Sequence, residues 1–297
     1  MEPETNQSIP QVDFLKRSDK PEIEILRFAS LLKRRDHLDH SPGNPHRLRF
    51  YIIMVVTRGS GTHFIDFLPY TFDQGSIILV SKGQVHAFDF TASWDGFLIM
   101  FTDDFLSKHL IHSDILSLHK LYNYHLHQPV ITPGKHERPM FENLIRGLTQ
   151  EYEHPDDFAR EELLKLHLKI FLLKIERFKQ GQIPDNSNTE TILTFMEYKR
   201  LIEQHYKETK NAKDYAQQMG ISYKHLNAVC KRIAGHTAKQ FIDGHVILEI
   251  KRHLATTGFS IKELAYEMGF DEPTNFVKFF SKHTRTTPAK FKQSLKI

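Results

Sequence analysis

The stretch Ala216-Gln217-Gln218-Met219-Gly220-Ile221 recurs 49 residues later as Ala265-Tyr266-Glu267-Met268-Gly269-Phe270. After one inserted residue, the correspondence continues at an offset of 50, in the pairs Leu226/Phe276, Cys230/Phe280, Thr237/Thr287 and Phe241/Phe291. Two copies at a period near 50 indicate a duplicated structural unit, because a solenoid needs a longer series of repeats.

Each copy has the pattern of a helix-turn-helix. A short helix is expected to end just before Gly220 or Gly269, where glycine can adopt the positive φ of a sharp turn. The apolar residue after each glycine should fill the corner between two helices. Ser222 or Asp271 is then expected to cap the second helix with its side-chain oxygen. The repeat therefore predicts two helix-turn-helix units.

The second helix of each unit should turn polar side chains outward, because its apolar residues follow the spacing of a buried helical face. The expected outward residues are Tyr223, Lys224, Asn227 and Lys231 in the first copy, and Thr274, Asn275, Lys278 and Lys282 in the second. A helix in the major groove brings such side chains to base edges and phosphates. Lysine binds phosphate without reading sequence, whereas Asn and Thr can contact bases. We expect these eight residues to contact DNA.

The positive charge of the chain lies in its C-terminal third. Residues 191–297 hold 18 Lys and Arg against 10 Asp and Glu, a net charge of +8. Residues 1–190 hold 22 against 26, or −4, which gives the overall +4. A basic C-terminal region favours a polyanionic partner. Solvated lysine-rich helices produce the same excess without nucleic acid, so charge supports the DNA interpretation only together with the repeat.

The C-terminal residues resemble the AraC/XylS family of transcription regulators over its signature of about forty residues. The matching residues are Ser260-Ile261-Lys262-Glu263-Leu264-Ala265, Met268-Gly269-Phe270-Asp271, Asn275-Phe276, Phe279-Phe280-Ser281-Lys282 and Thr287-Pro288-Ala289-Lys290-Phe291-Lys292. The first copy matches through Ala216, Ile221-Ser222, His225-Leu226-Asn227, Lys231 and Gly235-His236-Thr237. The resemblance implies a seven-helix domain in which His245–Thr257 is a linker helix. That helix would hold the two recognition helices in successive major grooves, ~34 Å apart.

Three positions depart from the family pattern. Arg285 stands where glycine is usual, which suggests a differently bent loop or an additional phosphate contact. Ala228 replaces a polar residue that often reads DNA, and Pro273 removes a candidate base contact at the start of the second recognition helix.

The N-terminal part of the chain has the pattern of a small β domain. Residues 1–48 look polar and irregular. Short β-branched runs punctuated by glycine and proline follow up to about residue 101 and predict a small barrel or sandwich. Helical patterns then cover 107–126, 137–152 and 158–179, and their apolar faces fit either a dimer interface or a cover for the barrel. The predicted fold class is α+β: a cupin-like β-barrel with flanking helices in residues 1–180, a linker at 181–190 and an all-α DNA-binding domain at 191–297.

The β region resembles the effector barrel of the same family more weakly, and its metal motif is degenerate. Gly75, Gly83 and His86 match part of the second cupin motif, whereas only His63 remains of the first. Two histidines supply too few ligands for a cupin metal centre, so we expect neither metal nor cofactor. The barrel interior remains a candidate effector pocket, with its lining predicted from Tyr51, Phe64, Phe72, His86, Phe88 and Trp94.

Composition limits the setting in which the chain works. The single cysteine, Cys230, excludes an intramolecular disulfide. The first residues lack signal-peptide features, no apolar run is long enough to cross a bilayer, and we expect a cytoplasmic protein. The sequence interpretation is a sequence-specific transcription regulator, not an enzyme, with double-stranded DNA, a small-molecule effector, a second copy of the chain and RNA polymerase as partners.

Two other functions stay open at the level of sequence. A metal-dependent cupin enzyme with an appended regulatory domain would use His63 and His86 to hold its metal. A protein-interaction module would use the C-terminal helices against a partner protein, without dependence on their basic residues.

Overall fold

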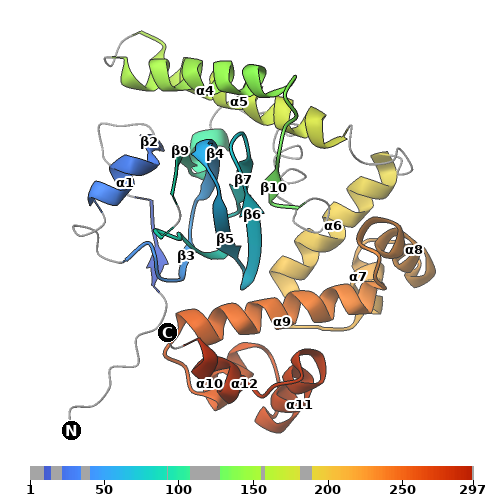
Figure 1. Cartoon of the computed structure of the whole chain (residues 1–297). Coiled ribbons are helices and arrows are strands. Elements are labelled where there is room, and N and C mark those ends of the chain that lie inside the picture. Colours follow the sequence, from blue (N-terminus) through green and yellow to red (C-terminus); the bar gives the residue numbers. More distant parts are fainter. Residues whose placement is uncertain are drawn as a thin grey trace, which may run out of the picture. The chain divides into compact units, whose positions relative to one another are not determined.

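The computed structural model describes residues 10–14, 22–34, 41–91, 93–107, 128–154, 158–180 and 189–295. Their contacts divide them into two compact units, one within residues 10–180 and one within 189–295 (Figure 1). The predicted linker lies mostly outside the described residues, although its last two positions already belong to a helix.

The N-terminal unit contains two β-sheets. The first has the order β1 (Gln11–Val12), β3 (His46–Leu48), β8 (Val85–Ala87), β5 (Gly61–Ile65) and β6 (Leu68–Phe72). The second has the order β10 (Val130–Ile131), β7 (Ile77–Val80), β4 (Tyr51–Gly59), β9 (Trp94–Phe101) and β2 (Ile23–Arg27). Within the described residues, hydrogen bonds join the strands into these two separate sheets. The predicted β domain is therefore confirmed, and its described strands form the two-sheet arrangement rather than a single closed barrel.

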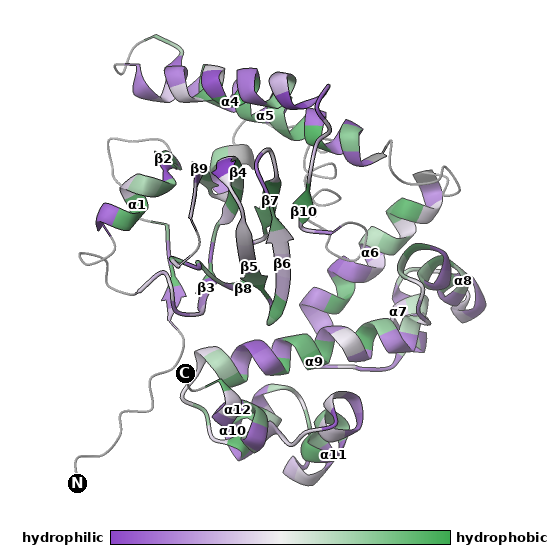
Figure 2. Cartoon of the chain, in the orientation of Figure 1, coloured by the Kyte–Doolittle hydropathy of each residue, from purple (hydrophilic) through white to green (hydrophobic). Residues whose placement is uncertain are grey.

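The centre of the second sheet is buried on both faces, which explains why β4 reads as an unbroken apolar run from Tyr51 to Val56. Ile52, Met54 and Val56 join the core shared with the first sheet. Alternate residues of the same strand, such as Ile53 and Val55, join a second core that includes the helices α4 (Arg138–Glu153) and α5 (Arg160–Gln180). Strand β7 is likewise apolar along its length (Figure 2).

Some of the residues expected to be irregular carry regular structure. Strand β2 pairs antiparallel with β9 from Ile23 to Arg27 and leads directly into α1 (Phe28–Arg34). Phe28 is buried against Trp94, with ring centroids 3.7 Å apart. The alternation of Ile23 and Ile25 was the sequence signal for this strand, and it is short enough to pass for a loop.

The helices of the N-terminal unit follow the predicted ranges closely where the structure describes them. Helices α4 and α5 match the patterns predicted at 137–152 and 158–179 and pack against each other (Figure 1). Helix α2 (Asp103–Ser107) precedes the pattern predicted at 107–126, nearly all of which lies outside the described residues.

Between residues 189 and 295 the chain forms seven helices. They are α6 (Thr189–His205), α7 (Ala212–Gln218), α8 (Tyr223–Ala234), α9 (Ala238–Thr256), α10 (Ile261–Glu267), α11 (Pro273–Thr284) and α12 (Pro288–Ser294). Helix α9 packs against α7 and α8 of the first helix-turn-helix and against α10 and α12 of the second half of the domain (Figure 1). It begins seven residues before the linker helix expected at His245, so it is longer than predicted.

The two turns form as the repeat predicts, with one exception in capping. Gly220 and Gly269 have φ of 65° and 69°, in the left-handed region that favours glycine. Ser222 caps α8 by accepting the backbone N–H of His225. The predicted cap at Asp271 was wrong: Pro273 occupies the first helical position, so Glu272 is the N-cap of α11, and its side chain accepts no backbone N–H of the helix.

Candidate nucleic-acid interface

Helix α8 presents a polar surface to solvent. Leu226, Val229 and Cys230 are buried on its inner side, and burial raises the pKa of the Cys230 thiol to about 12. On the outer side, the structure exposes the side chains of Tyr223, Lys224, His225, Ala228, Lys231 and Arg232. Three of the four residues predicted to face outward on α8 are therefore exposed.

Helix α11 presents a comparable surface. Phe276 and Phe280 are fully buried, whereas Thr274, Asn275, Lys278 and Lys282 are all exposed. Phe270 fills the corner of this unit, with its ring centroid 5.4 Å from those of Phe276 and Phe279. This packing turns the four predicted residues toward solvent.

The two helices carry matching stripes along their outer faces. Thr274, Lys278 and Lys282 stand at successive helical spacings of four and are all exposed. The equivalent positions of the first copy are Lys224, Ala228 and Arg232, also exposed. Arg232 was missed in the sequence analysis, although the repeat itself pairs it with Lys282.

Asn227 differs from the expectation for an outward side chain. It is half-buried, and its Oδ1 accepts a hydrogen bond from the backbone N–H of Ala238, 2.9 Å away. Ala238 is the first residue of α9, where backbone N–H groups lack helical partners. Asn227 therefore joins α8 to the start of α9 through its side-chain oxygen.

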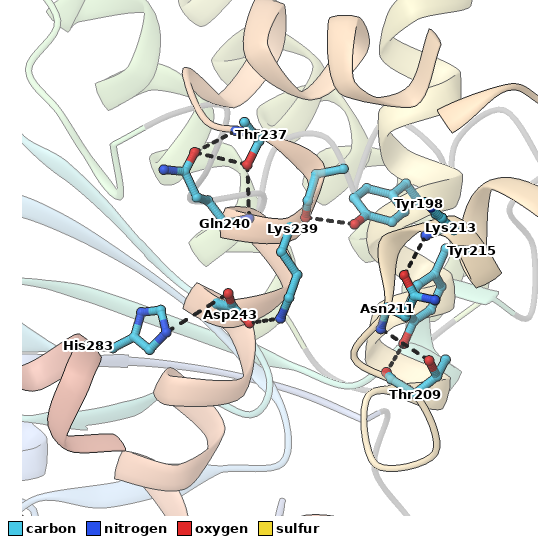
Figure 3. Close-up of polar contacts among 11 residues, drawn as sticks. Tyr198, Thr209, Asn211, Lys213, Tyr215, Thr237, Lys239, Gln240, Asp243 and His283 are labelled. Carbon is cyan, nitrogen blue, oxygen red and sulfur yellow. Dashed lines mark hydrogen bonds and ion pairs between the residues drawn. The ribbon is translucent and has the colours of Figure 1, made fainter. Parts of the chain in front are cut away.

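A polar network fixes the start of α9 around this contact (Figure 3). Thr237 and Gln240 form a reciprocal capping box at the N-terminus of the helix. The hydroxyl of Tyr198, from α6, donates to the carbonyl of Ala238 at 2.8 Å. Because Tyr198 is buried, its pKa is raised well above the ordinary value and the hydroxyl remains a donor.

A second network shapes the loop before α7 (Figure 3). The Tyr215 hydroxyl donates to the carbonyl of Thr209 at 2.9 Å, and the Thr209 hydroxyl oxygen accepts the backbone N–H of Asn211. Asn211 in turn caps α7 by accepting the N–H of Lys213. Asn is a preferred N-cap residue, so Asn211 directly before Ala212 was the sequence signal for the start of this helix.

The loop after α11 is bent in the same way as its counterpart after α8. Arg285 ends α11 with φ of 59°, and Gly235 ends α8 with φ of 71°. The backbone N–H of each residue donates a hydrogen bond to the carbonyl oxygen of the residue four positions earlier. The loss of the family's glycine has therefore not changed the bend. It places arginine in a conformation that glycine adopts with less strain.

The interior of the N-terminal unit contains three buried histidines. His63 Nε2 and His86 Nδ1 are 3.1 Å apart, and the ring of His46 lies 4.3 Å from that of His86. Burial, together with the nearby His46, lowers the pKa of His63 to about 3, so this ring is neutral near pH 7. The ring of Phe88 lies 5.1 Å from that of His86 and 5.4 Å from that of His63. The core shared by the two sheets thus combines a polar pair with aromatic rings.

The six residues predicted to line an effector pocket do not meet in one place. Phe72, Phe88 and Trp94 belong to the core between the sheets, and His86 lies beside them. Tyr51 packs in the other core, with residues of α4 and α5, because it alternates with Ile52 along β4. Phe64 is 47% exposed because its neighbour His63 takes the inward side of β5. Tyr51 and Phe64 therefore lie apart from the other four predicted residues.

The histidine cluster is not arranged as a metal centre. His63 and His86 bond each other through ring nitrogens, and His46 Nδ1 donates to the carbonyl of Asn44. Across the described residues, no group of three or more His, Cys, Asp or Glu side chains is placed to hold a metal ion. None of the described helices is long and apolar enough to span a membrane.

Two family models match the chain, one in each of its compact units. Residues 215–294 match a helix-turn-helix domain model, and residues 28–168 match the model of the AraC-like ligand binding domain. A similar protein is the HTH-type transcriptional activator RhaS of Salmonella paratyphi A, 20% identical over 254 residues, which are 84% of this chain and 87% of the relative.

Solved structures give more distant similarities. ToxT from Vibrio cholerae, crystallised with an unsaturated fatty acid, is 16% identical, with a TM-score of 0.43 over 84% of this chain and 88% of that one. An AraC-type regulator structure from Chromobacterium violaceum is 20% identical, with a TM-score of 0.33 over 37% of this chain and 97% of that one. The two matched domains and the repeated helix-turn-helix make this chain a DNA-binding transcription regulator of the AraC/XylS family.

Proposed function

We propose that the regulator reads a two-part DNA site by placing α8 and α11 in successive major grooves. The observation that carries this proposal is the pair of matching exposed stripes on equivalent helices, Lys224/Ala228/Arg232 and Thr274/Lys278/Lys282. Each stripe lies opposite buried residues that hold its helix in the domain. A recognition helix needs this combination of a fixed inner side and a polar outer side.

The side chains on the stripes divide by chemistry. Lys224, Lys231, Lys278 and Lys282 are proposed to bind phosphates, and Arg232 joins this set on the strength of its exposure. Thr274 and Asn275 at the start of α11 are proposed to contact bases, since amide and hydroxyl groups match base-edge donors and acceptors. Tyr223 is proposed to contact DNA at the start of α8. Asn227 is proposed to position α8 rather than to read a base, because its oxygen bonds the start of α9.

An effector is proposed to bind between the two sheets of the N-terminal unit. The buried His63–His86 pair beside Phe88 combines hydrogen-bonding nitrogens with aromatic surface. A ligand with an apolar body and one polar group fits this chemistry. Binding would alter DNA affinity only if the ligand prefers one arrangement of the protein over another.

A homodimer is proposed to form through α5. Leu163, Leu166, Ile170 and Leu173 are each at least 40% exposed and recur at spacings of three, four and three residues. This is the a/d spacing of a coiled-coil seam. We propose activation of transcription as the regulatory output, because similar proteins are named transcriptional activators. Contact with RNA polymerase, a location in the cytoplasm and a role without catalysis belong to the same proposal. We place the domain boundary between residues 180 and 191.

Site selection from a random duplex library tests the DNA proposal. The wild-type chain should enrich one sequence, and Asn275→Ala should bind it about 1–3 kcal/mol more weakly, with relaxed preference at a base pair within one half. Lys278→Ala should weaken binding to all duplexes about equally, because phosphate contacts carry no sequence information. Lys135→Ala, the same charge change on an exposed residue of the N-terminal unit, is the control. Unchanged binding by both α11 variants would contradict the proposal.

A further inference from the structure

The loop between α6 and α7, residues 206–211, contacts the turn of the second helix-turn-helix. Lys207 forms an ion pair with Glu267 at the end of α10. Lys210 donates to the carbonyl of Gly269 at 3.0 Å, and its ammonium lies 4.4 Å from the centre of the Phe270 ring. One short loop of the first half of the domain therefore contacts the end of α10, the turn glycine and the corner residue of the second half.

The backbone fit at Gly269 shows how close this contact is. A Cβ atom placed on Gly269 would lie 1.7 Å from the carbonyl oxygen of Lys207, which is not a permissible approach. Gly220, its equivalent in the first copy, has almost the same φ, but a Cβ there would meet nothing within 4 Å. The positive φ of the turn favours glycine at both positions, whereas the close approach of the loop requires glycine only at Gly269.

The environment of Lys210 is that of a packed residue. Burial lowers the pKa of Lys210, nearby Lys239 lowers it further, and Asp271 raises it. Both side chains of the Lys207–Glu267 pair are more exposed than Lys210, and an exposed ion pair of this kind adds little stability alone. The carbonyl bond, the ring contact and the backbone fit therefore carry the connection.

A separate side-chain approach links α11 to α9. His283 lies 3.9 Å from Asp243, which also pairs with Lys239 (Figure 3). The second helix-turn-helix is thus attached to the rest of the domain through α9 and, independently, through the loop 206–211. Two attachments far apart in sequence restrict rotation of the unit more than α9 alone.

We propose that the loop 206–211 is a clamp that sets the angle and distance between α8 and α11, and so determines which spacing of half-sites the domain accepts. Lys210 and Gly269 are its positioning residues. This inference rests on the proposed function, because spacing matters only if both helices enter DNA.

A distance measurement without DNA tests the clamp itself. Spin labels at Ala228→Cys and Lys278→Cys, in a Cys230→Ala background, report the separation of equivalent positions on α8 and α11. A narrow distance distribution is expected with the clamp intact. Lys210→Ala, Lys210→Met and Gly269→Ala should broaden it, whereas Gly220→Ala, with the same backbone strain but no loop contact, and Lys213→Ala should leave it narrow. Equal distributions in all folded variants would overturn the proposal.

A binding measurement tests the consequence. Unlabelled protein is titrated with the selected duplex and with the same duplex carrying one extra base pair between the half-sites. The wild-type chain and Gly220→Ala should prefer the selected spacing by about tenfold or more, which is the order of the cost of one mismatched position in a site. Lys210→Ala and Gly269→Ala should reduce that ratio by about threefold or more. An unchanged ratio would overturn the specificity claim. If Gly269→Ala does not fold, as judged by circular dichroism, the Lys210 variants carry the test. If the wild-type chain binds no duplex, the proposed function is refuted. If the distance distribution still depends on Lys210 and Gly269 in that case, the role of the loop in setting the distance between α8 and α11 stands.

Discussion

The side-chain oxygen of Asn227 accepts the backbone N–H of Ala238 at 2.9 Å and thereby joins the candidate recognition helix α8 to the start of α9. We predict that Asn227→Ala destabilises the C-terminal unit by about 1–2 kcal/mol, because it orphans a part-buried donor. Asn227→Asp keeps the acceptor and adds a charge that the helix N-terminus favours, so it should remain near wild-type stability.

The single cysteine supplies the measurement for Asn227. Cys230 is fully buried in the C-terminal unit, so its reaction with a thiol reagent over a urea series reports unfolding of that unit. A smaller midpoint shift for Asn227→Ala than for Asn227→Asp would show that the bond to Ala238 is not the reason for Asn at this position.

Arg285 adopts a left-handed conformation at the end of α11, and replacing it with glycine should increase the stability of the domain. We predict that Arg285→Gly raises the free energy of unfolding by about 1 kcal/mol, because glycine adopts this conformation without the Cβ penalty. Arg285→Ala removes the same charge but keeps the strain, and should not stabilise. The urea midpoint from Cys230 labelling distinguishes the two, and equal stability of both variants would contradict the strain argument.

The stability of the N-terminal unit should fall in acid because His63 is buried as a neutral ring. Its pKa is about 3 in the folded protein and near 6.5 when exposed. The unfolded state therefore binds the additional proton between these values. Stability from this residue is complete above pH 6.5 and is lost by up to about 1.4 kcal/mol per pH unit as the pH falls toward 3.

The only tryptophan provides the probe for this pH dependence. Trp94 lies in the core between the sheets, so its fluorescence in urea follows the N-terminal unit within the full chain. We predict a smaller slope of unfolding free energy against pH, between pH 5 and 6.5, for His63→Gln than for the wild type. Identical slopes would mean that His63 does not lose a proton on folding.

The exposed stripe on α5 predicts a self-associating surface. A charge at its centre, in Ile170→Glu, should convert a dimer to a monomer because the carboxylate would be desolvated in the seam. Phe158→Glu removes another exposed apolar residue, outside the stripe, and should leave the dimer intact. Sedimentation equilibrium measures the mass. A monomeric wild-type chain, or a dimeric Ile170→Glu variant, would rule out this interface.

The C-terminal unit was largely predictable because its signals are local and occur twice. Turn glycines, caps and helical spacing are short-range features, and the repeat allowed each copy to support the other. Asp271 failed as a cap because Pro273 shifts the helix start by one residue. The role of Asn227 was hidden because its partner, Ala238, lies eleven residues away beyond a turn.

The N-terminal unit was less predictable because its decisive contacts are long-range. Alternation along β4 shows two faces but does not say which core each face joins, and so the sequence could not separate Tyr51 from the residues of the other core. Sheet closure depends on strand pairing between distant residues, such as Ile23 with Phe101, which no local pattern encodes. The contacts of Lys207 and Lys210 are likewise about 60 residues apart in sequence.

The most direct test of the account is the salt dependence of duplex binding, measured by fluorescence anisotropy for the wild type and for two double variants. Lys224→Ala with Lys231→Ala alters α8, and Lys278→Ala with Lys282→Ala alters α11. If both helices contact phosphates, each double variant should reduce the slope of log K against log salt concentration by up to about 1.8, or ~0.9 for each lysine that no longer binds a phosphate. A slope that changes for only one helix, or for neither, would contradict the claim that two recognition helices grip the DNA together.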